Sequence, residues 1–150
     1  NDKELMKFLV TTIPFPMTYW EEEEWIKSQK SNNEGNYNFA IEDIETNKYI
    51  GGCGIQNVNW LARVATVGIM IGDKDYWGKG YGTDAMKVLI NFIFNDMNIN
   101  KIRLGTFSFN ERAIKSYEKC GFKVEGVLKD EIFKDGKYYD EIIMSIFNNK

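Results

Sequence analysis

The sequence predicts an α/β domain in which helices flank a mixed, mostly antiparallel central sheet. Helical segments come first, and three strands, a helix, a strand, a short helix and further strands follow. Residues 64–71 are apolar on both faces and rich in β-branched side chains, as is typical of a central strand. The 150 residues suffice for one domain with a substantial core, which we expect to span residues 1–150.

Two helices are predicted in the first part of the chain. Residues 3–10 carry apolar side chains at helical spacing, and Pro14 and Pro16 then break the chain. Thr18 begins the second helix, because Glu21 stands three residues later as its capping-box partner. The apolar side of this helix is expected to consist of Trp20, Trp25 and Ile26.

A hairpin follows a polar loop at residues 31–36. Residues 38–44 and 49–57 predict its two strands, and residues 45–48 have the composition of a turn. The second strand contains three glycines, which indicate a bulge or the close approach of another backbone. These glycines are Gly51, Gly52 and Gly54.

Thr83 begins an amphipathic helix in the middle of the chain. Its apolar residues recur at a spacing of three or four, namely Ala85, Met86, Leu89, Ile90, Ile93 and Met97. Residues 101–109 predict the next strand. Asn110 is expected to cap a short helix, and Gly121 to end it at the C′ position.

The end of the chain is predicted to be a hairpin. Residues 122–128 and 132–133 have strand character, and 138–147 form a long final strand. Between them, Asp135 and Gly136 are the residue pair that a two-residue hairpin turn prefers.

Composition excludes several classes of protein. The net charge of -3 and the absence of a basic block argue against a nucleic-acid partner. The chain has no histidine and no Cys-x-x-Cys pair, so we expect no metal and no Ser-His or Cys-His nucleophile. No run of 18 apolar residues predicts a membrane span. We expect a cytoplasmic protein in which Cys53 and Cys120 are reduced.

A glycine-rich segment connects the strand at 64–71 to the helix that begins at Thr83. Its three glycines, which allow the backbone to curl tightly, are Gly78, Gly80 and Gly82. The amides of residues 79–83 can then converge on an anion at the helix start, where Lys79 adds a positive charge. The hydroxyl of Thr83 is a further donor.

Other readings of this segment are a phosphate loop of another class or a tight turn without a ligand. The P-loop spacing Gly-x-x-x-x-Gly-Lys-Ser/Thr is absent. The Rossmann pattern fits poorly, because the third glycine comes one residue early and its acidic partner would fall near Asn98, outside a strand.

The short helix after Asn110 carries a second pattern. Asn110, Ala113, Ile114 and Tyr117 share one side of the helix, because steps of three and four residues return to the same face. Without further context, this pattern predicts an N-cap asparagine and a core tyrosine.

Together these segments resemble the two signature segments of the GNAT acetyltransferases. Residues 77–82 match the family pattern Gln/Arg-x-x-Gly-x-Gly/Ala except at Trp77. The pattern Asn-x-x-Ala-x-x-x-Tyr-x-x-x-Gly-Phe is matched in full by Asn110, Ala113, Tyr117, Gly121 and Phe122. The resemblance covers about residues 38–147. Residues 73–77 and 135–140 resemble the branch of ribosomal-protein N-terminal and polyamine acetyltransferases.

The resemblance implies that acetyl-CoA is the cosubstrate and that an acceptor amine attacks its thioester directly. The central strand would splay from its neighbour and pair with pantetheine through Ile69, Met70 and Ile71, and an amide near Met70 would polarise the thioester carbonyl. Asn110 would also bind pantetheine. The loop residues expected at the pyrophosphate are Trp77, Gly78, Lys79, Gly80, Tyr81, Gly82 and Thr83.

Tyr117 is the catalytic acid that the resemblance implies. Its hydroxyl keeps a proton at pH 7, and a departing thiolate can take that proton. The general base is left open, because some relatives carry a glutamate on the central strand where this chain has Thr66. Glu42, Asp43 and a water chain to a backbone carbonyl are the alternatives.

The expected acceptors are a small-molecule amine, with a polyamine first, a peptide N-terminus, and an amino sugar antibiotic. An aromatic wall that suits a cation is predicted from Phe15, Tyr19, Trp20, Trp60, Tyr138 and Tyr139. The alternatives are an acetyl-CoA sensor without transferase activity and a nucleotide-binding module.

Two further expectations come from the resemblance. It allows a homodimer, because the final strands of this branch sometimes pair between subunits. The family's usual first strand is not seen ahead of Asp2, so we expect either that the given sequence is incomplete or that this strand is missing.

Overall fold

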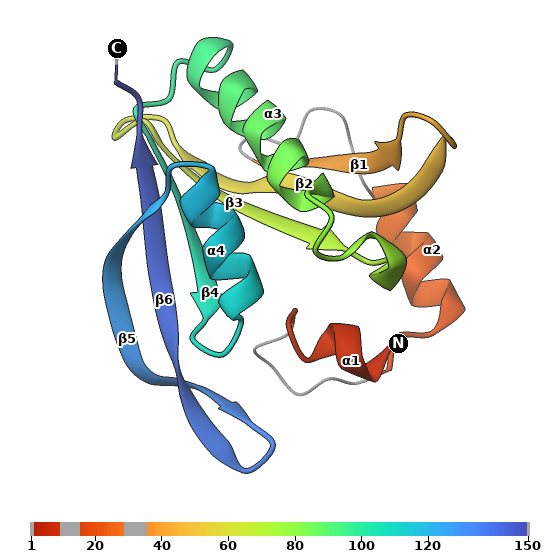
Figure 1. Ribbon diagram of the computed structural model, residues 1–150. Helices are drawn as coiled ribbons and strands as arrows, with labels where there is room; N and C mark the ends of the chain where they lie inside the picture. Colours follow the sequence, from red (N-terminus) through yellow and green to blue (C-terminus); the bar gives the residue numbers. More distant parts are fainter. Residues whose placement is uncertain (1, 10–15, 29–35, 150) are drawn as a thin grey trace.

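A six-stranded sheet forms the centre of the molecule, with strand order β1-β2-β3-β4-β6-β5 (Figure 1). The computed structural model describes residues 2–9, 16–28 and 36–149. The strands are β1 (Tyr37–Asp43), β2 (Lys48–Asn59), β3 (Val64–Ile71), β4 (Lys101–Phe107), β5 (Lys123–Lys134) and β6 (Lys137–Phe147). The helices are α1 (Lys3–Met6), α2 (Tyr19–Ser28), the 3-10 turn η1 (Lys74–Tyr76), α3 (Tyr81–Asn95) and α4 (Glu111–Lys119).

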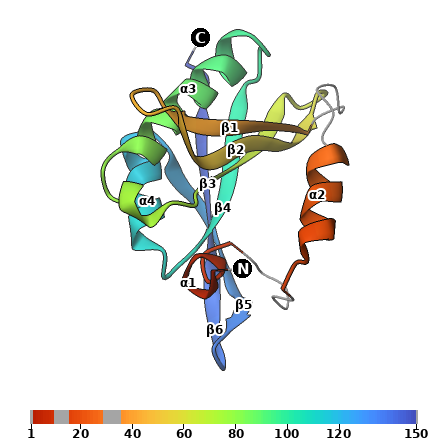
Figure 2. The same ribbon diagram turned by 90° about the vertical axis from the view of Figure 1, so that its right-hand side faces the viewer.

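The sheet is mixed and mostly antiparallel, as predicted. β3 and β4 run parallel, and the other neighbouring strands of the described sheet run antiparallel. Helices α3 and α4 cover one face and α2 lies on the other side, as Figure 2 shows. The core lies between the sheet and α3 and α4, and includes Ile55, Val67, Met86, Leu89, Ile93, Ile102, Leu104 and Met144.

Strands β3 and β4 pair over a short distance only. Val64–Thr66 align with Lys101–Arg103, whereas β3 continues to Ile71 and β4 to Phe107. Beyond this pairing the two strands diverge (Figure 1). β3 keeps its ladder to β2 and β4 keeps its ladder to β6, so both strands remain part of the sheet while the edges between them separate.

Several local predictions are confirmed. The capping box forms, since the Thr18 amide donates to the Glu21 carboxylate at 2.7 Å and the Glu21 amide donates to Thr18 Oγ1 at 3.3 Å. Asn110 caps α4 by accepting from the Ala113 amide at 3.3 Å. The Asp135–Gly136 turn joins β5 to β6 with both residues at positive φ, as a type I′ turn requires.

Other element boundaries differ from the predictions. Helix α3 begins at Tyr81 rather than at Thr83, because Gly80 takes the N-cap position. Strand β5 is continuous across the two predicted segments, with an irregular register between Leu128 and Ile132. Helix α1 ends at Met6, earlier than predicted, and β4 ends at Phe107 rather than at 109.

The apolar side of α2 is largely exposed in the described structure. Trp20, Trp25 and Ile26 are 72%, 50% and 58% exposed. Helical spacing identifies an apolar side, but burial requires a partner surface. The segments 10–15 and 29–35 that flank α2, with Pro14, Phe15 and most of the predicted 31–36 loop, lie outside the described residues. None of the described helices has the length and hydropathy needed to span a bilayer.

The glycines of β2 mark a close approach between strands, as predicted. A Cβ at Gly51 would lie 2.9 Å from the Cα of Ile71 and even closer to the Met70 carbonyl oxygen. Because both neighbouring atoms belong to the backbone, neither can move aside without disturbing the ladder that holds β3 against β2. Glycine at position 51 therefore allows β2 to pair closely with the end of β3, the strand that separates from β4.

We expect Gly51→Ala to lower the free energy of unfolding by about 1–3 kcal/mol, because overpacked sites cost that much. Urea denaturation measures the change. The matched control is Gly126→Ala, since an added Cβ there meets nothing within 4 Å. A Gly51→Ala variant as stable as this control would contradict the argument.

Candidate functional site

A large cleft occupies the region where β3 and β4 diverge. Its volume is about 1780 Å³, larger than the roughly 300–1,000 Å³ of pockets for drug-sized ligands. Walls come from β3 and β4, from parts of β1, β2 and β6, from the glycine segment and α4, and from parts of α1 and α2. The predicted site residues that line it are Ile69, Met70, Ile71, Trp77, Gly78, Gly80, Gly82, Thr83, Asn110 and Tyr117.

The cleft reaches both faces of the sheet. Ala65, Val67 and Ile69 of β3 contact the core under the helices, so the alternating residues Thr66 and Gly68 face the other way. Residues of both sets line the cleft. Two ligands could therefore meet at the opening from opposite faces of the sheet.

The glycine segment has the backbone shape that its sequence predicts. Gly78 and Gly80 have φ angles of 71° and 94°, a region that L side chains rarely adopt. Gly80 is the N-cap of α3, and the first amide seen to donate back along the helix is that of Asp84, to the Gly80 carbonyl at 2.9 Å. The preceding amides of the first turn are available to an anion.

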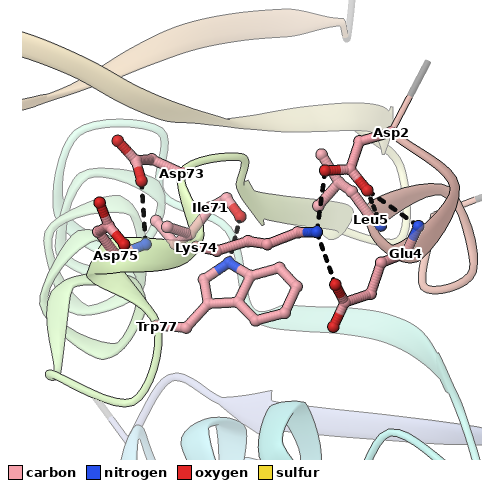
Figure 3. Close-up of polar contacts among 8 residues, drawn as sticks. All are labelled: Asp2, Glu4, Leu5, Ile71, Asp73, Lys74, Asp75 and Trp77. Carbon is pink, nitrogen blue, oxygen red and sulfur yellow. Dashed lines mark hydrogen bonds and ion pairs between the residues drawn. The ribbon is translucent and has the colours of Figure 1, made fainter.

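Trp77 ties the glycine segment to the end of β3. Its indole nitrogen donates to the Ile71 carbonyl at 2.7 Å, as Figure 3 shows. The Arg112 guanidinium lies 3.7 Å from the centroid of the indole ring, which links the segment to α4. The residue that departs from the family pattern thus anchors the loop, and it binds the carbonyl of Ile71, one of the residues predicted to contact pantetheine.

Two acidic residues at the start of α1, its N-cap Asp2 and Glu4, bind a lysine of the same region. Lys74 forms ion pairs with Asp2 at 2.9 Å and with Glu4 at 2.6 Å (Figure 3). Phe8 packs edge-on against Trp77, with ring centroids 6.2 Å apart. These contacts place the start of the chain beside the end of β3.

The side chains of Lys79 and Tyr81 do not line the cleft. Both border a separate, smaller pocket of about 310 Å³, together with Asp43, Lys48 and Tyr76. Tyr81 stacks edge-on with Tyr76 at 4.8 Å between ring centroids. Lys79 and Tyr81 can therefore contact a ligand in the cleft only through their backbone. The sequence had instead predicted that the Lys79 charge lies beside the anion.

The Thr83 hydroxyl is also engaged within the protein. It shares a hydrogen bond of 2.8 Å with the Ser116 hydroxyl, which connects α3 to α4. The thiol of Cys120 donates to the Thr83 carbonyl at 3.5 Å, and both Cys53 and Cys120 are free. These two hydrogen bonds hold the start of α3, next to the glycine segment, against α4, which carries Tyr117.

Tyr117 lies at the floor of the cleft and is 9% exposed. Burial, with a smaller contribution from Cys120, raises the pKa of its hydroxyl to about 12. Among the described residues none bonds to this hydroxyl, and no fully buried side-chain oxygen lacks a partner. The hydroxyl is therefore open to the cleft, and it remains protonated at any physiological pH.

The acidic residues weighed as bases lie away from the cleft. Asp43 accepts from Thr46 Oγ1 at 2.8 Å and from the Tyr76 hydroxyl at 3.1 Å. The Thr46 hydrogen bond is the main cause that lowers the pKa of Asp43, which makes it a weaker base. Neither Asp43 nor Glu42 lines the cleft, whereas Thr66 does and accepts from Arg103 Nε at 3.1 Å.

The described members of the predicted aromatic wall do not lie together, and its Phe15 is outside the described residues. Tyr19 and Trp20 stack on each other and are largely exposed, and Tyr138 is 65% exposed. Tyr139 packs against Phe109, at 4.8 Å between ring centroids. The aromatic side chains that do line the cleft are Phe8, Trp25, Phe39, Tyr49, Tyr76, Trp77, Phe107 and Tyr117.

Sequence reasoning missed two residues on the face opposite the helices. Glu141 of β6 and Gly105 of β4 both line the cleft. Their signals were present in the sequence, as an acidic residue within an apolar final strand and a glycine within a central strand. What the sequence does not show is that these two positions lie side by side.

Comparison with known proteins agrees with this geometry. A family model described as an acetyltransferase (GNAT) domain matches residues 1–123. The chain is 30% identical over 142 residues to spermidine N(1)-acetyltransferase of Vibrio cholerae, covering 89% of this chain and 81% of that protein. The corresponding enzyme of Escherichia coli is 32% identical, with 89% and 75% covered.

A solved structure shows the same architecture. The spermidine N-acetyltransferase of Vibrio cholerae in complex with CoA and spermine matches with a TM-score of 0.86 at 28% identity, covering 98% of this chain and 84% of that one. The family match spans most of the chain, and the fold and the two signature segments agree with it. The chain therefore belongs to the GNAT acetyltransferase family.

Proposed function

We propose that residues 1–150 form one acetyl-CoA-dependent domain that transfers the acetyl group to a primary amine of a polyamine. The observation that carries this proposal is the opening between β3 and β4, with the glycine segment at one end and Tyr117 on its floor. The spermidine acetyltransferases among the relatives support a polyamine as acceptor. A peptide N-terminus and a homodimer through the final strands stay predictions.

In this proposal acetyl-CoA enters from the side of α3 and α4. The pyrophosphate binds the free amides at the start of α3, where the helix dipole favours negative charge. Pantetheine extends along β3 beyond Thr66, where β4 no longer supplies a ladder partner. Ile69 and Met70 provide that edge, and Asn110 borders it from α4.

Tyr117 serves as the proton donor to the departing thiolate. Its raised pKa keeps the hydroxyl protonated, so it reaches the sulfur as a hydrogen-bond donor. The acid form is lost only as pH rises through about 12. We therefore expect no decline of activity between pH 7 and 10 from the titration of this residue.

The acceptor is identified by measuring thiol release from acetyl-CoA with a panel of amines. We expect release with spermidine or spermine, and slower release with an alanine- or serine-starting peptide and an aminoglycoside. A peptide that outperforms the polyamines would replace them as the acceptor. Absence of release with every amine, although acetyl-CoA binds, would contradict the proposed transferase activity.

We expect Tyr117→Phe to lower kcat by about 100-fold or more, because a positioned acid contributes roughly 10²–10⁴-fold. The Kd for acetyl-CoA, measured by calorimetry, should change less than threefold, since the ring still fills its place in the core. Tyr138→Phe is the matched control, because Tyr138 is exposed and does not line the cleft. An unchanged kcat for Tyr117→Phe would exclude the acid role.

We expect Gly80→Ala to weaken acetyl-CoA binding at least tenfold, because φ at Gly80 is 94° and an alanine would displace the first amides of α3. Calorimetric titration with CoA measures the effect. Gly136→Ala is a matched control, since φ there is also positive, at 76°, but the hairpin turn lies away from the cleft. Equal CoA affinity in both variants would show that the loop does not hold the cofactor.

A further inference from the structure

The carboxylate of Glu141 lies where the opening between β3 and β4 begins. Glu141 is paired with Phe107 across the β4–β6 ladder, and its side chain extends back over Gly105. A Cβ at Gly105 would lie 3.1 Å from the carboxyl carbon of Glu141 and closer still to Oε1. Gly105 stands two residues beyond Arg103, the last residue of β4 that pairs with β3. The missing side chain of Gly105 therefore makes room for this carboxylate.

Glu141 belongs to the face of the sheet opposite α3 and α4. Its neighbours Ile142 and Met144 pack in or against the core under those helices, and side chains alternate along a strand. Tyr117 belongs to the core cluster on the helix side. Both residues line the same cleft, so Glu141 and Tyr117 approach the opening from opposite faces.

The negative charge of Glu141 has no counter-ion among the described residues. No hydrogen bond or ion pair joins it to another described side chain, and the cations on neighbouring elements contact other groups. Arg103 of β4 donates to Thr66, Lys129 of β5 pairs with Asp140 at 2.7 Å, and Lys134 donates to the carbonyls of Met6 and Lys7.

These surroundings favour a cation at Glu141. The carboxylate is half-buried and lines the cleft, which Glu22 of α2 and Glu111 of α4 also line. A charge in a partly buried site attracts an opposite charge more strongly than it would in water. An ammonium group would satisfy a carboxylate that the protein itself leaves without a partner.

We propose that Glu141 receives the ammonium group of the acceptor and removes one of its protons. This inference rests on the proposed function and supplies the base that the sequence left open. An alkyl ammonium is only about 0.04% neutral at pH 7, so some group must take its proton before the nitrogen can attack. The Glu141 carboxylate, on β6, lies where β3 and β4 begin to separate, on the face of the sheet away from α3 and α4.

The proposed transfer forms a C–N bond and breaks the C–S bond of the thioester. One proton passes from the ammonium to Glu141 and on to water, and the nitrogen lone pair then forms a bond to the thioester carbonyl carbon. The C–S bond breaks, and the sulfur keeps its electron pair and takes a proton from Tyr117. A second proton from the nitrogen restores Tyr117. The products are the acetamide, the CoA thiol and one released proton.

We expect Glu141→Gln to lower kcat/KM for spermidine about 100-fold or more at pH 7, as loss of a positioned base does. The ratio of wild-type to variant kcat/KM should shrink as pH rises to 10, where about 30% of the amine is neutral by itself. A merely structural role would leave this ratio constant. Glutamine has nearly the same size and shape as glutamate, so it still fits over Gly105. An unchanged Kd for CoA and an unchanged Tm would verify that the variant is folded.

Asp140→Asn is the matched control. Asp140 is the adjacent carboxylate, it pairs with Lys129, and it does not line the cleft. We expect its kcat/KM for spermidine to stay within about twofold of wild type, since a surface ion pair contributes little.

Two results would overturn the proposal. A Glu141→Gln variant with a kcat/KM within twofold of wild type, or with a loss that is equal at pH 7 and pH 10, would exclude Glu141 as the base while leaving the transferase activity in place. A wild-type protein that binds CoA but acetylates no amine would remove the proposed function, and this inference with it.

Discussion

The short pairing of β3 with β4 is the constraint on which the rest of this molecule depends. Hydrogen bonds between the two strands end at Thr66 and Arg103, although both strands continue for several residues. Backbone groups on the separated edges still require partners. The fold keeps them in place through the ladders to β2 and β6, and so presents a rigid, unpaired strand edge to a ligand.

Both ends of β3 are held by contacts from distant parts of the chain. At the end where β3 and β4 still pair, the Arg63 guanidinium donates to the Asn98 carbonyl. The Arg63 carbonyl in turn accepts from the amides of Asn100 and Lys101, where β4 begins. At the open end, the Trp77 indole bonds to Ile71, and Lys48 pairs with Asp73 at 2.6 Å. These anchors hold the glycine segment as a turn at the mouth of the cleft, and its positive φ angles are ones that glycine adopts readily.

In the proposed mechanism, the acid and the base belong to opposite faces of the sheet. On the helix side, burial keeps the Tyr117 hydroxyl protonated, which suits a donor to a leaving thiolate. On the opposite side, Gly105 leaves room for the carboxylate of Glu141, which suits a cationic amine. The thioester would lie between them, so that the acid and the base reach the reacting atoms from opposite directions.

The sequence by itself determined the features that depend on neighbouring residues. The Thr18–Glu21 capping box, the Asp135–Gly136 turn and the Asn110 cap follow from spacings of a few positions, and all formed as predicted. The order of helices and strands along the chain, the mixed character of the sheet and the family followed from patterns of the same local kind, whereas the order of the strands within the sheet came from the structure. Only the tertiary structure decided which side chains share the cleft. The Lys79 charge, the exposed side of α2 and the Glu141–Gly105 contact depend on segments far apart in the chain, whose relative placement no local spacing encodes.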